Sequence, residues 1–425
     1  MSRQSALDFM KCHGMDAARI DPVPEARRMV SAMEDGLRRD GAGLPMIPTY
    51  LRTDDLVPFG SCAVVIDAGG TNFRAGLVRF TENGALMERM SKTQMPGIVS
   101  PVKWEEFIRF VADAIEPLLD EADDIGFCFS YSADITPKID GRVIRIDKEV
   151  VIEESEGKLV GASLLEELAR RGIHGKHIVI LNDTAAVLLG GAAMLDRSRI
   201  GGLVGQVSGT GTNTCCVLPL RRIGKLGREE DTRILVNLES GLYDGLPRGD
   251  YDILLDEESH NPGMKWLEKL TAGVYLGELA RLCLEGALGE GLLETETQNK
   301  MRQYGRFNAA VLDAWACGEN LEGFPCADDR AFLQTVAQEL FYRSARAMCA
   351  NLMGILLLTG EGTDPERPVV VCEEGSLVQK GRCYRPELQR LVAECCAELG
   401  RYVQLSVGEE TTLPGAAAAA LLNRR

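Results

Sequence analysis

The fold of this chain is decided by the stretch Val64-Val65-Ile66-Asp67-Ala68-Gly69-Gly70-Thr71-Asn72-Phe73-Arg74-Ala75-Gly76-Leu77-Val78. Three β-branched residues run into an aspartate, a Gly-Gly turn follows, and alternating small and apolar residues lead away, which predicts a β-hairpin with a glycine tip. At such a tip, backbone N–H groups can approach an anion closely, and Thr71 and Asn72 add side-chain donors. Asp67 ends a buried strand and is placed to hold a magnesium ion through water, because hard cations take oxygen ligands. The alternative, a plain surface turn, gives this aspartate no use.

Length, charge and cysteine usage narrow the class of protein. The chain has 425 residues, a net charge of −16 and 13 cysteines. This length favours two lobes over one compact core, and the negative charge argues against a nucleic-acid partner, which calls for a basic face. No run approaches the length of a membrane span, and charged residues stand where a signal peptide would be apolar, so we expect no membrane partner and a cytoplasmic protein. The cysteines are scattered without a Cys-x-x-Cys pair, which favours reduced core thiols.

A second stretch repeats the form of the first. Residues 203–217 read as an apolar strand, a glycine tip with threonine and asparagine, and a second apolar strand. The parallel between Gly70-Thr71-Asn72 and Gly211-Thr212-Asn213 indicates an internal duplication, in which two related lobes each offer a phosphate-holding turn.

Two further apolar strands end in polar residues, where α/β proteins bind ligands. Residues 125–129 lead to Ser130 and Tyr131, and residues 177–181 lead to Asn182 and Asp183 at the start of a helix. The helix start places the Asp183 carboxylate near a partial positive charge. The alternative role for Asp183 is that of an N-cap, a position that aspartate favours.

These motifs resemble those of the hexokinase and glucokinase family, within the actin-like ATPase superfamily. The segment from Asp67 to Arg74 resembles the family's first phosphate loop. The most specific likeness is the run Asn261-Pro262-Gly263, then Glu268-Lys269, then Tyr275-Leu276-Gly277-Glu278-Leu279, which we expect to lead into one long helix reaching Leu282. The resemblance implies an α/β protein with the two-lobed actin-like ATPase (ribonuclease H-like) fold, in which each lobe is a mixed β-sheet flanked by helices and the ligand cleft lies between the lobes.

The resemblance also suggests boundaries for the lobes. Residues 1–54 would form a helix and a crossing segment packed on the large lobe. The small lobe would be 55–182, with the first phosphate hairpin and the sugar strand. The large lobe would be 183–412, and a C-terminal helix, 413–425, would return to the small lobe.

The family's functional residues carry over onto matching positions. Asp183 would be the general base, and Lys148 would oppose charge on the transferred group. The implied sugar contacts are Ser130, Tyr131, Asp147, Lys148, Asn182, Asp183, Asn213, Glu239 and Glu268. The implied nucleotide contacts are Asp67, Gly69, Gly70, Thr71, Asn72, Arg74, Gly209, Thr210, Gly375, Ser376 and Gly415. The chain departs from the family at three places. Asp147 replaces a threonine, and Glu373-Glu374 replace the usual small and acidic residues before Gly375. In the second adenosine loop, only Gly415 matches.

The predicted function is therefore that of a hexokinase of glycolysis, which transfers the γ-phosphate of ATP to the 6-hydroxyl of a hexose, with Mg²⁺ held by Asp67 through water. Paired carboxylates such as Glu239 and Glu268 suit a polyol, because each accepts two hydroxyl hydrogen bonds. The substrates would be hexose, with glucose first, and ATP, and the chain would be a monomer or homodimer. Mannose, fructose and another phosphate donor stay open.

Two other functions remain as alternatives. One is a catalytically silent hexose sensor, which Asp147 and the altered C-terminal loop favour. The other is an actin-like or chaperone nucleotide switch, which would leave Ser130, Asn213, Glu239 and Glu268 without a task.

Overall fold

The computed structural model describes residues 2–53, 56–146, 150–193, 195–304 and 307–424. The chain divides into two compact units. The first unit contains Met1–Pro45, Val207–Thr214 and Glu239–Val407, and the second contains Met46–Gln206, Cys215–Leu238 and Gly408–Arg425. The chain passes between the units inside two strands, β11 (Gly202–Ser208) and β12 (Thr212–Pro219).

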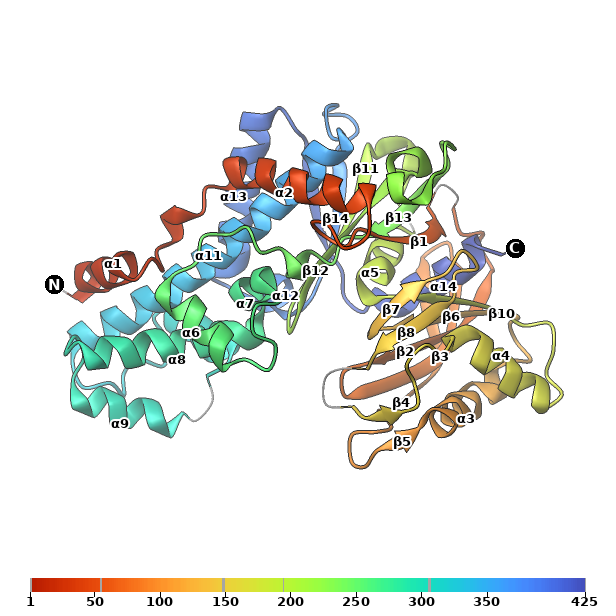
Figure 1. Ribbon diagram of the computed structural model, residues 1–425, viewed down its shortest axis with the longest axis horizontal. Helices are drawn as coiled ribbons and strands as arrows, with labels where there is room; N and C mark the ends of the chain where they lie inside the picture. Colours follow the sequence, from red (N-terminus) through yellow and green to blue (C-terminus); the bar gives the residue numbers. More distant parts are fainter. Residues whose placement is uncertain (1, 54–55, 147–149, 194, 305–306, 425) are drawn as a thin grey trace. The chain divides into compact units, whose positions relative to one another are not determined.

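The second unit carries most of the strands (Figure 1). Its strands are β1 (Ile47–Arg52), β2 (Cys62–Gly69), β3 (Asn72–Thr81), β4 (Gly84–Gln94), β5 (Val102–Lys103), β6 (Asp124–Phe129), β7 (Ser132–Ile135), β8 (Gly141–Arg145), β9 (Ile152–Glu153), β10 (His177–Leu181) and β13 (Arg233–Asn237). Its helices are α3 (Trp104–Ile115), α4 (Val160–Arg170), α5 (Asp183–Ala192) and α14 (Thr412–Leu422). A five-stranded mixed sheet runs in the order β10-β6-β2-β3-β4, and β1, β13, β12 and β11 neighbour one another in that order.

Alternation along β2 and β6 gives the five-stranded sheet two different faces. Val64, Ile66 and Phe127 point into an apolar core that α3 and α4 cover. The intervening residues point to the face covered by α14, where a Cβ on Gly126 would lie 1.9 Å from the Ala416 carbonyl oxygen. Asp67 belongs to this second face, so the alternation of the strand decides that its carboxylate faces away from the apolar core.

The first unit is mostly helical (Figure 1). Its helices are α1 (Ser2–Cys12), α2 (Pro22–Arg38), α6 (Asp250–Glu258), α7 (Trp266–Thr271), α8 (Gly273–Gly289), α9 (Thr295–Gln303), α10 (Ala309–Ala316), α11 (Ala327–Thr359), α12 (Ser376–Lys380) and α13 (Tyr384–Leu399). Two parallel strands, β14 (Val369–Glu374) and β15 (Val403–Val407), complete it. The 33-residue α11 is the centre, and α1, α2, α7, α8, α10 and α13 pack against it.

The expected long helix after Asn261 is wrong, because it is broken at Ala272. This residue has extended backbone angles, φ −81° and ψ 144°, between α7 and α8. The break is stabilised by tertiary bonds: the Thr271 hydroxyl donates to Thr212 Oγ1 at 2.9 Å, and the Gly273 N–H donates to the Gly209 carbonyl at 2.8 Å. Two helices replace one because the backbone at this point bonds to the second glycine tip.

The cysteines are all free thiols, and eight of the 13 are buried, which confirms the expectation of reduced core cysteine. Over the part of the chain that the structure describes, no helix has the length and apolar character needed to cross a bilayer.

A buried ion pair joins α6 to α11 in the first unit. Arg343 donates from Nη2 and Nη1 to the two carboxylate oxygens of Asp252, at 2.5 and 3.2 Å, and both side chains are buried. We expect Arg343→Met to lower the free energy of unfolding by about 3–5 kcal/mol, because an unpaired carboxylate stays buried. Urea unfolding followed by circular dichroism measures this loss. Adding Asp252→Asn removes the unpaired buried charge and should restore most of the lost stability. Equal stability of the wild type and Arg343→Met would contradict a stabilising role for this ion pair.

His13, which follows α1, joins the end of this helix to Asp250 at the start of α6 and to Glu290 at the end of α8. His13 Nδ1 lies 2.8 Å from Asp250 Oδ2, and His13 Nε2 lies 2.6 Å from Glu290 Oε1. Burial lowers the pKa of His13, but the hydrogen bonds to the two carboxylates outweigh it and raise the pKa overall. A raised pKa stabilises the fold fully below the unfolded value of about 6.5 and loses this effect as pH rises through the folded value.

We therefore expect α1 to become more sensitive to proteolysis as pH rises from about 6 to about 9. Limited proteolysis with identification of cleavage sites measures this change. His13→Gln, which cannot carry the charge, should show little pH dependence over the same range. A steep pH dependence that persists in this variant would contradict the role of His13.

Candidate active site

The first predicted hairpin is confirmed and lies in the second unit. β2 and β3 pair antiparallel, with Asp67 opposite Arg74 and Gly69 opposite Asn72. Gly70 forms the tip with φ 60°, a left-handed conformation that glycine adopts without a Cβ clash. Asp67 and Arg74 thus stand side by side at the root of the tip.

Asp67 is held by the guanidinium of Arg74. Arg74 Nε and Nη2 donate to the same oxygen, Asp67 Oδ2, at 3.0 and 2.8 Å. Burial raises the pKa of Asp67 and Arg74 lowers it, while the charge of Asp183 raises it further. A neighbouring carboxylate that disfavours the ionisation of Asp67 marks a place where a cation is stabilising.

These residues fit a hydrated magnesium ion better than a fully protein-bound metal. No group of three or more metal-ligating side chains gathers among the residues that the structure describes. Mg²⁺ commonly binds through one or two carboxylates and keeps several waters. The single Asp67 carboxylate, with its pKa raised by burial and by Asp183, meets this requirement.

Asp183 begins α5, directly after β10. The N-cap is Asn182, whose Oδ1 accepts the Ala185 N–H at 2.9 Å, so the capping role considered for Asp183 belongs to its neighbour. Asp183 Oδ1 accepts the Thr184 N–H at 2.7 Å. This bond orients the carboxylate at the positive end of the helix.

Ser130 and Tyr131 follow β6 on the same unit. The Ser130 N–H donates to the Ala68 carbonyl at 3.1 Å, and a Cβ on Gly69 would lie 2.8 Å from the Ser130 Cβ. The predicted sugar-binding serine and the predicted phosphate hairpin therefore touch. Tyr131 is buried, and its hydroxyl donates to the Gly70 carbonyl at 3.3 Å, so this side chain holds the hairpin tip. Asp147 and Lys148 lie outside the described residues.

The first unit brings together three predicted sugar residues. Asn213 Nδ2 lies 3.4 Å from Glu239 Oε1, and Asn213 Oδ1 accepts the Ser240 N–H at 3.2 Å. Glu268 Oε2 accepts the Thr212 N–H at 3.4 Å. Glu239 has φ 54°, a strained conformation for a residue with a side chain and one that concentrates at functional sites.

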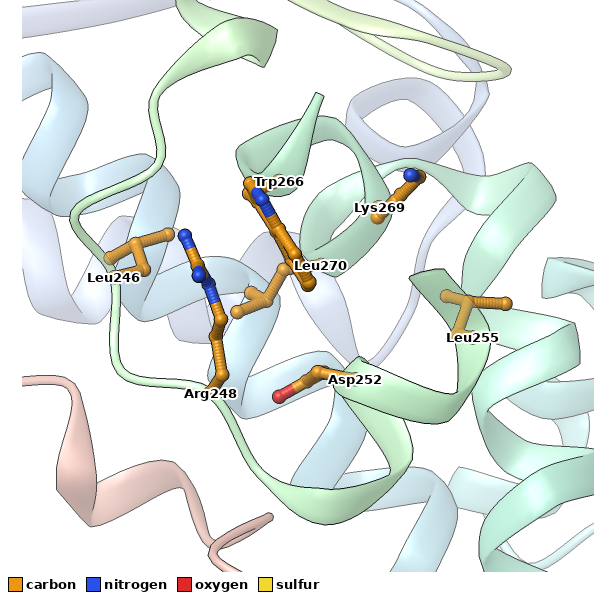
Figure 2. A pocket seen from close by; sticks show the side chains of 7 residues that line it. All are labelled: Leu246, Arg248, Asp252, Leu255, Trp266, Lys269 and Leu270. Carbon is orange, nitrogen blue, oxygen red and sulfur yellow. The ribbon is translucent and has the colours of Figure 1, made fainter. Parts of the chain in front are cut away.

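Figure 2 shows Arg248, Trp266 and Lys269 among the side chains that line a pocket beside α7, the helix that carries Glu268. The sequence analysis did not identify this group. Lys269 is buried, and its Nζ donates to Asp256 Oδ1 at 2.5 Å and to the Asn261 carbonyl at 2.8 Å. The Arg248 guanidinium lies 3.9 Å above the Trp266 ring. These contacts fix α7, and with it Glu268, from both ends. The only sequence signal for them is the spacing between Asn261 and Lys269.

Lys265 is a second residue near Glu268 that the sequence analysis did not predict. Its Nζ lies 3.2 Å from Glu268 Oε1, and its backbone is left-handed, with φ 57°. The ammonium pairs with the Glu268 carboxylate and so helps to set its orientation. Lysine beside a carboxylate three residues on is common on helices, so the sequence alone did not distinguish this pair.

The two predicted nucleotide turns of the first unit lie against each other. Gly375 has φ 118°, and a Cβ there would lie 2.4 Å from the Ser208 carbonyl oxygen. A Cβ on Gly209 would lie 3.2 Å from the Ser376 backbone nitrogen. Nearby, burial raises the pKa of Glu373 to about 7, against an opposing effect of Arg385. The second tip and the predicted adenosine turn are thus one structure, and only glycine allows their close approach.

Gly415 lies elsewhere, in the first turn of α14 in the second unit. A Cβ there would lie 1.8 Å from the Ala186 carbonyl oxygen of α5. Close helix packing explains this glycine, so its nucleotide contact rests on the resemblance alone.

Comparison with known proteins places the chain in a family. Residues 14–193 and 203–422 match two family models, each described as hexokinase. The chain belongs to the hexokinase family. Hexokinase-3 of Oryza sativa is 30% identical over 441 positions, which cover 94% of this chain and 86% of that relative. Hexokinase-1 of Schizosaccharomyces pombe is 28% identical and covers 94% and 87% of the two chains.

The hexokinase fold is shared with solved structures. A hexokinase from Schistosoma mansoni in complex with glucose superposes with a TM-score of 0.77 at 21% identity, covering 99% of this chain and all of that one. A ROK hexokinase from Thermus thermophilus gives 0.53 at 17% identity, covering 85% and 97% of the two chains. The predicted actin-like ATPase fold, with mixed sheets flanked by helices, is confirmed.

Proposed function

We propose that this hexokinase transfers the γ-phosphate of ATP to the 6-hydroxyl of a hexose, with Asp183 as the general base. The observation that carries the proposal is the position of Asp183 at the start of α5, where its charge raises the pKa of Asp67. Asp183 would accept the proton of the attacking hydroxyl. A base of this kind contributes about a hundredfold to ten-thousandfold to the rate.

The proposed roles are divided between residues of the two units. In the second unit, Ser130 and Asn182 would contact the sugar, and Asp67 would hold hydrated magnesium, which neutralises phosphate charge when it is bound. In the first unit, Glu239, Glu268 and Asn213 would accept and donate hydrogen bonds to sugar hydroxyls. The tips at Gly70-Thr71 and Gly209-Thr210 would fix phosphates through backbone N–H groups, as Gly375-Ser376 would the adenosine.

Four parts of the proposal rest on the family resemblance. Lys148 would oppose charge on the transferred group, and Asp147, Tyr131 and Gly415 would contact ligands. The lobe boundaries proposed above, a place in glycolysis and a monomeric or dimeric state have the same basis. A cytoplasmic location is proposed from the charged residues near the N-terminus. Glucose is the first hexose to test, because the Schistosoma relative is titled as a glucose complex.

The test is ADP release by the purified protein with magnesium-ATP and glucose, mannose, fructose or N-acetylglucosamine in turn. Release that depends on a hexose supports the proposal and ranks the substrates. Glucose binding in a melting assay without any release would overturn it in favour of the silent sensor. The family match disfavours the sensor, as does the Asp67 and Asp183 pair, since a sensor has no use for a base.

A further inference from the structure

A buried tyrosine of the first unit connects the two segments that carry the predicted sugar carboxylates. Tyr243 ends the short turn that begins at Glu239, in which the Leu242 N–H donates to the Glu239 carbonyl at 3.0 Å. The Tyr243 carbonyl accepts the Leu267 N–H at 3.0 Å, one residue before Glu268. The backbone of Tyr243 therefore joins the Glu239 turn to α7.

The same turn also contacts the Glu268 side chain. A Cβ on Gly241 would lie 3.2 Å from the Glu268 Cβ and 3.6 Å from Glu268 Oε2. Glu239 starts the turn with φ 54°, a strained conformation that persists only where the surrounding structure holds it. A shift of this turn would therefore move both carboxylates.

The Tyr243 side chain attaches the turn to α2. Its hydroxyl donates to Glu25 Oε1 at 2.7 Å, and both side chains are buried. Glu25 Oε2 accepts from Arg28, with Nε at 3.1 Å and Nη2 as a second donor. Burial and the hydrogen bond to Glu25 raise the pKa of Tyr243, so the phenol keeps the proton that it donates. The turn is thus bonded to a carboxylate that its own helix holds in place.

We propose that Tyr243 is a positioning residue, which uses its hydrogen bond to Glu25 to hold Glu239 and Glu268 in the arrangement that a hexose needs. The inference rests on the proposed function, in which these two carboxylates contact the sugar. Binding groups have to be held within about 0.5 Å of the productive geometry. Tyr243 would act on the sugar through the two carboxylates, from beneath the site.

The alternative is that Tyr243 is a packing residue whose hydroxyl happens to find an acceptor. Three substitutions separate the two roles. Tyr243→Phe keeps the ring and removes the hydroxyl, Glu25→Met removes the acceptor, and Glu25→Gln keeps an acceptor oxygen. A packing role predicts lower melting temperatures with unchanged affinity for glucose. A positioning role predicts that the affinity falls when either partner of the bond is removed and is kept in Glu25→Gln.

The experiment measures glucose binding by titration calorimetry and the steady-state constants by ADP release, with a melting temperature for each variant. We expect Tyr243→Phe and Glu25→Met to weaken glucose binding and raise the KM for glucose by about five- to tenfold. The KM for ATP and kcat should stay within about twofold of wild type, because only the binding of the sugar is impaired. Glu25→Gln should stay within about threefold of wild type in all constants.

Tyr251→Phe is the matched control. Tyr251 is also a buried tyrosine of the first unit, but it lies on α6 and its ring packs on Phe9. This variant should bind glucose as the wild type does. An equal loss of glucose affinity in Tyr251→Phe and Tyr243→Phe would overturn the inference.

A double-mutant cycle completes the test. If the two residues act through their shared hydrogen bond, Tyr243→Phe should add little to the effect of Glu25→Met. Additive effects, wild-type affinity in both single variants, or equal rises in the KM values for glucose and ATP would each overturn the inference. A wild type that binds glucose without releasing ADP would overturn the proposed reaction alone, because calorimetry still decides the role of Tyr243. A wild type that binds none of the four sugars would overturn both.

Discussion

Replacing Asp183 with alanine or asparagine is expected to lower hexose-dependent ADP release by a hundredfold or more. The physical reason is the loss of the group that accepts the hydroxyl proton, whose contribution is of this order. Asparagine is the sharper variant, because its side-chain oxygen can still accept the Thr184 N–H that Asp183 Oδ1 accepts at 2.7 Å. Steady-state kinetics, together with glucose binding by calorimetry, separates lost chemistry from lost binding.

A matched control is available on the same unit. Asp196 also precedes a short helical segment, and its Oδ1 accepts the Ser198 N–H at 3.0 Å, but it is not among the proposed site residues. Asp196→Asn should leave the rate unchanged. If Asp183→Asn keeps more than about a tenth of the wild-type rate, general-base catalysis by Asp183 is excluded, because such a base contributes at least a hundredfold.

Replacing Glu239 with glutamine is expected to raise the KM for glucose by about ten- to a hundredfold, with a smaller effect on the KM for ATP. A carboxylate that accepts sugar hydroxyls makes charge-assisted hydrogen bonds worth about 1.5–3 kcal/mol, and glutamine keeps the shape but not the charge. Glu268→Gln should act similarly, and it should also release Lys265, which now lies 3.2 Å from its Oε1.

The control for these variants is Glu285→Gln. Glu285 pairs with Arg281 at 2.8 Å on the exposed side of α8 and contacts no proposed ligand group. It should leave both KM values unchanged. A rise in the KM for ATP that equals the rise for glucose would show that Glu239 acts on the fold of the first unit rather than on the sugar.

Local patterns in the sequence carried a large part of this picture. The β-branched run before Asp67, with its Gly-Gly tip, predicted the β2–β3 hairpin, and its second copy predicted β11 and β12. The strand before Asn182 and the helix after it placed Asp183 correctly at a helix start. These features can be predicted from the sequence because each depends on neighbours within a few residues. The order of the motifs along the chain indicated the hexokinase family, which the comparisons confirm.

Side-chain roles that depend on distant partners were less accessible. Asn182 caps α5, and Asp183 does not. Both residue types favour the cap position, so the sequence could not choose between them, and only the backbone geometry decides. Tyr131 donates to Gly70, a residue 61 positions away. The break at Ala272 depends on the bonds that Thr271 and Gly273 make to the second tip.

The sequence by itself determined the two glycine tips, the strands and helices that carry Asp67 and Asp183, and the family. Only the tertiary structure decided that Lys265 pairs with Glu268 and that Lys269 donates to Asp256. The physical reason is that backbone pattern is set by nearby residues, whereas a hydrogen bond or an ion pair forms between whichever groups the packed chain brings within about 3 Å.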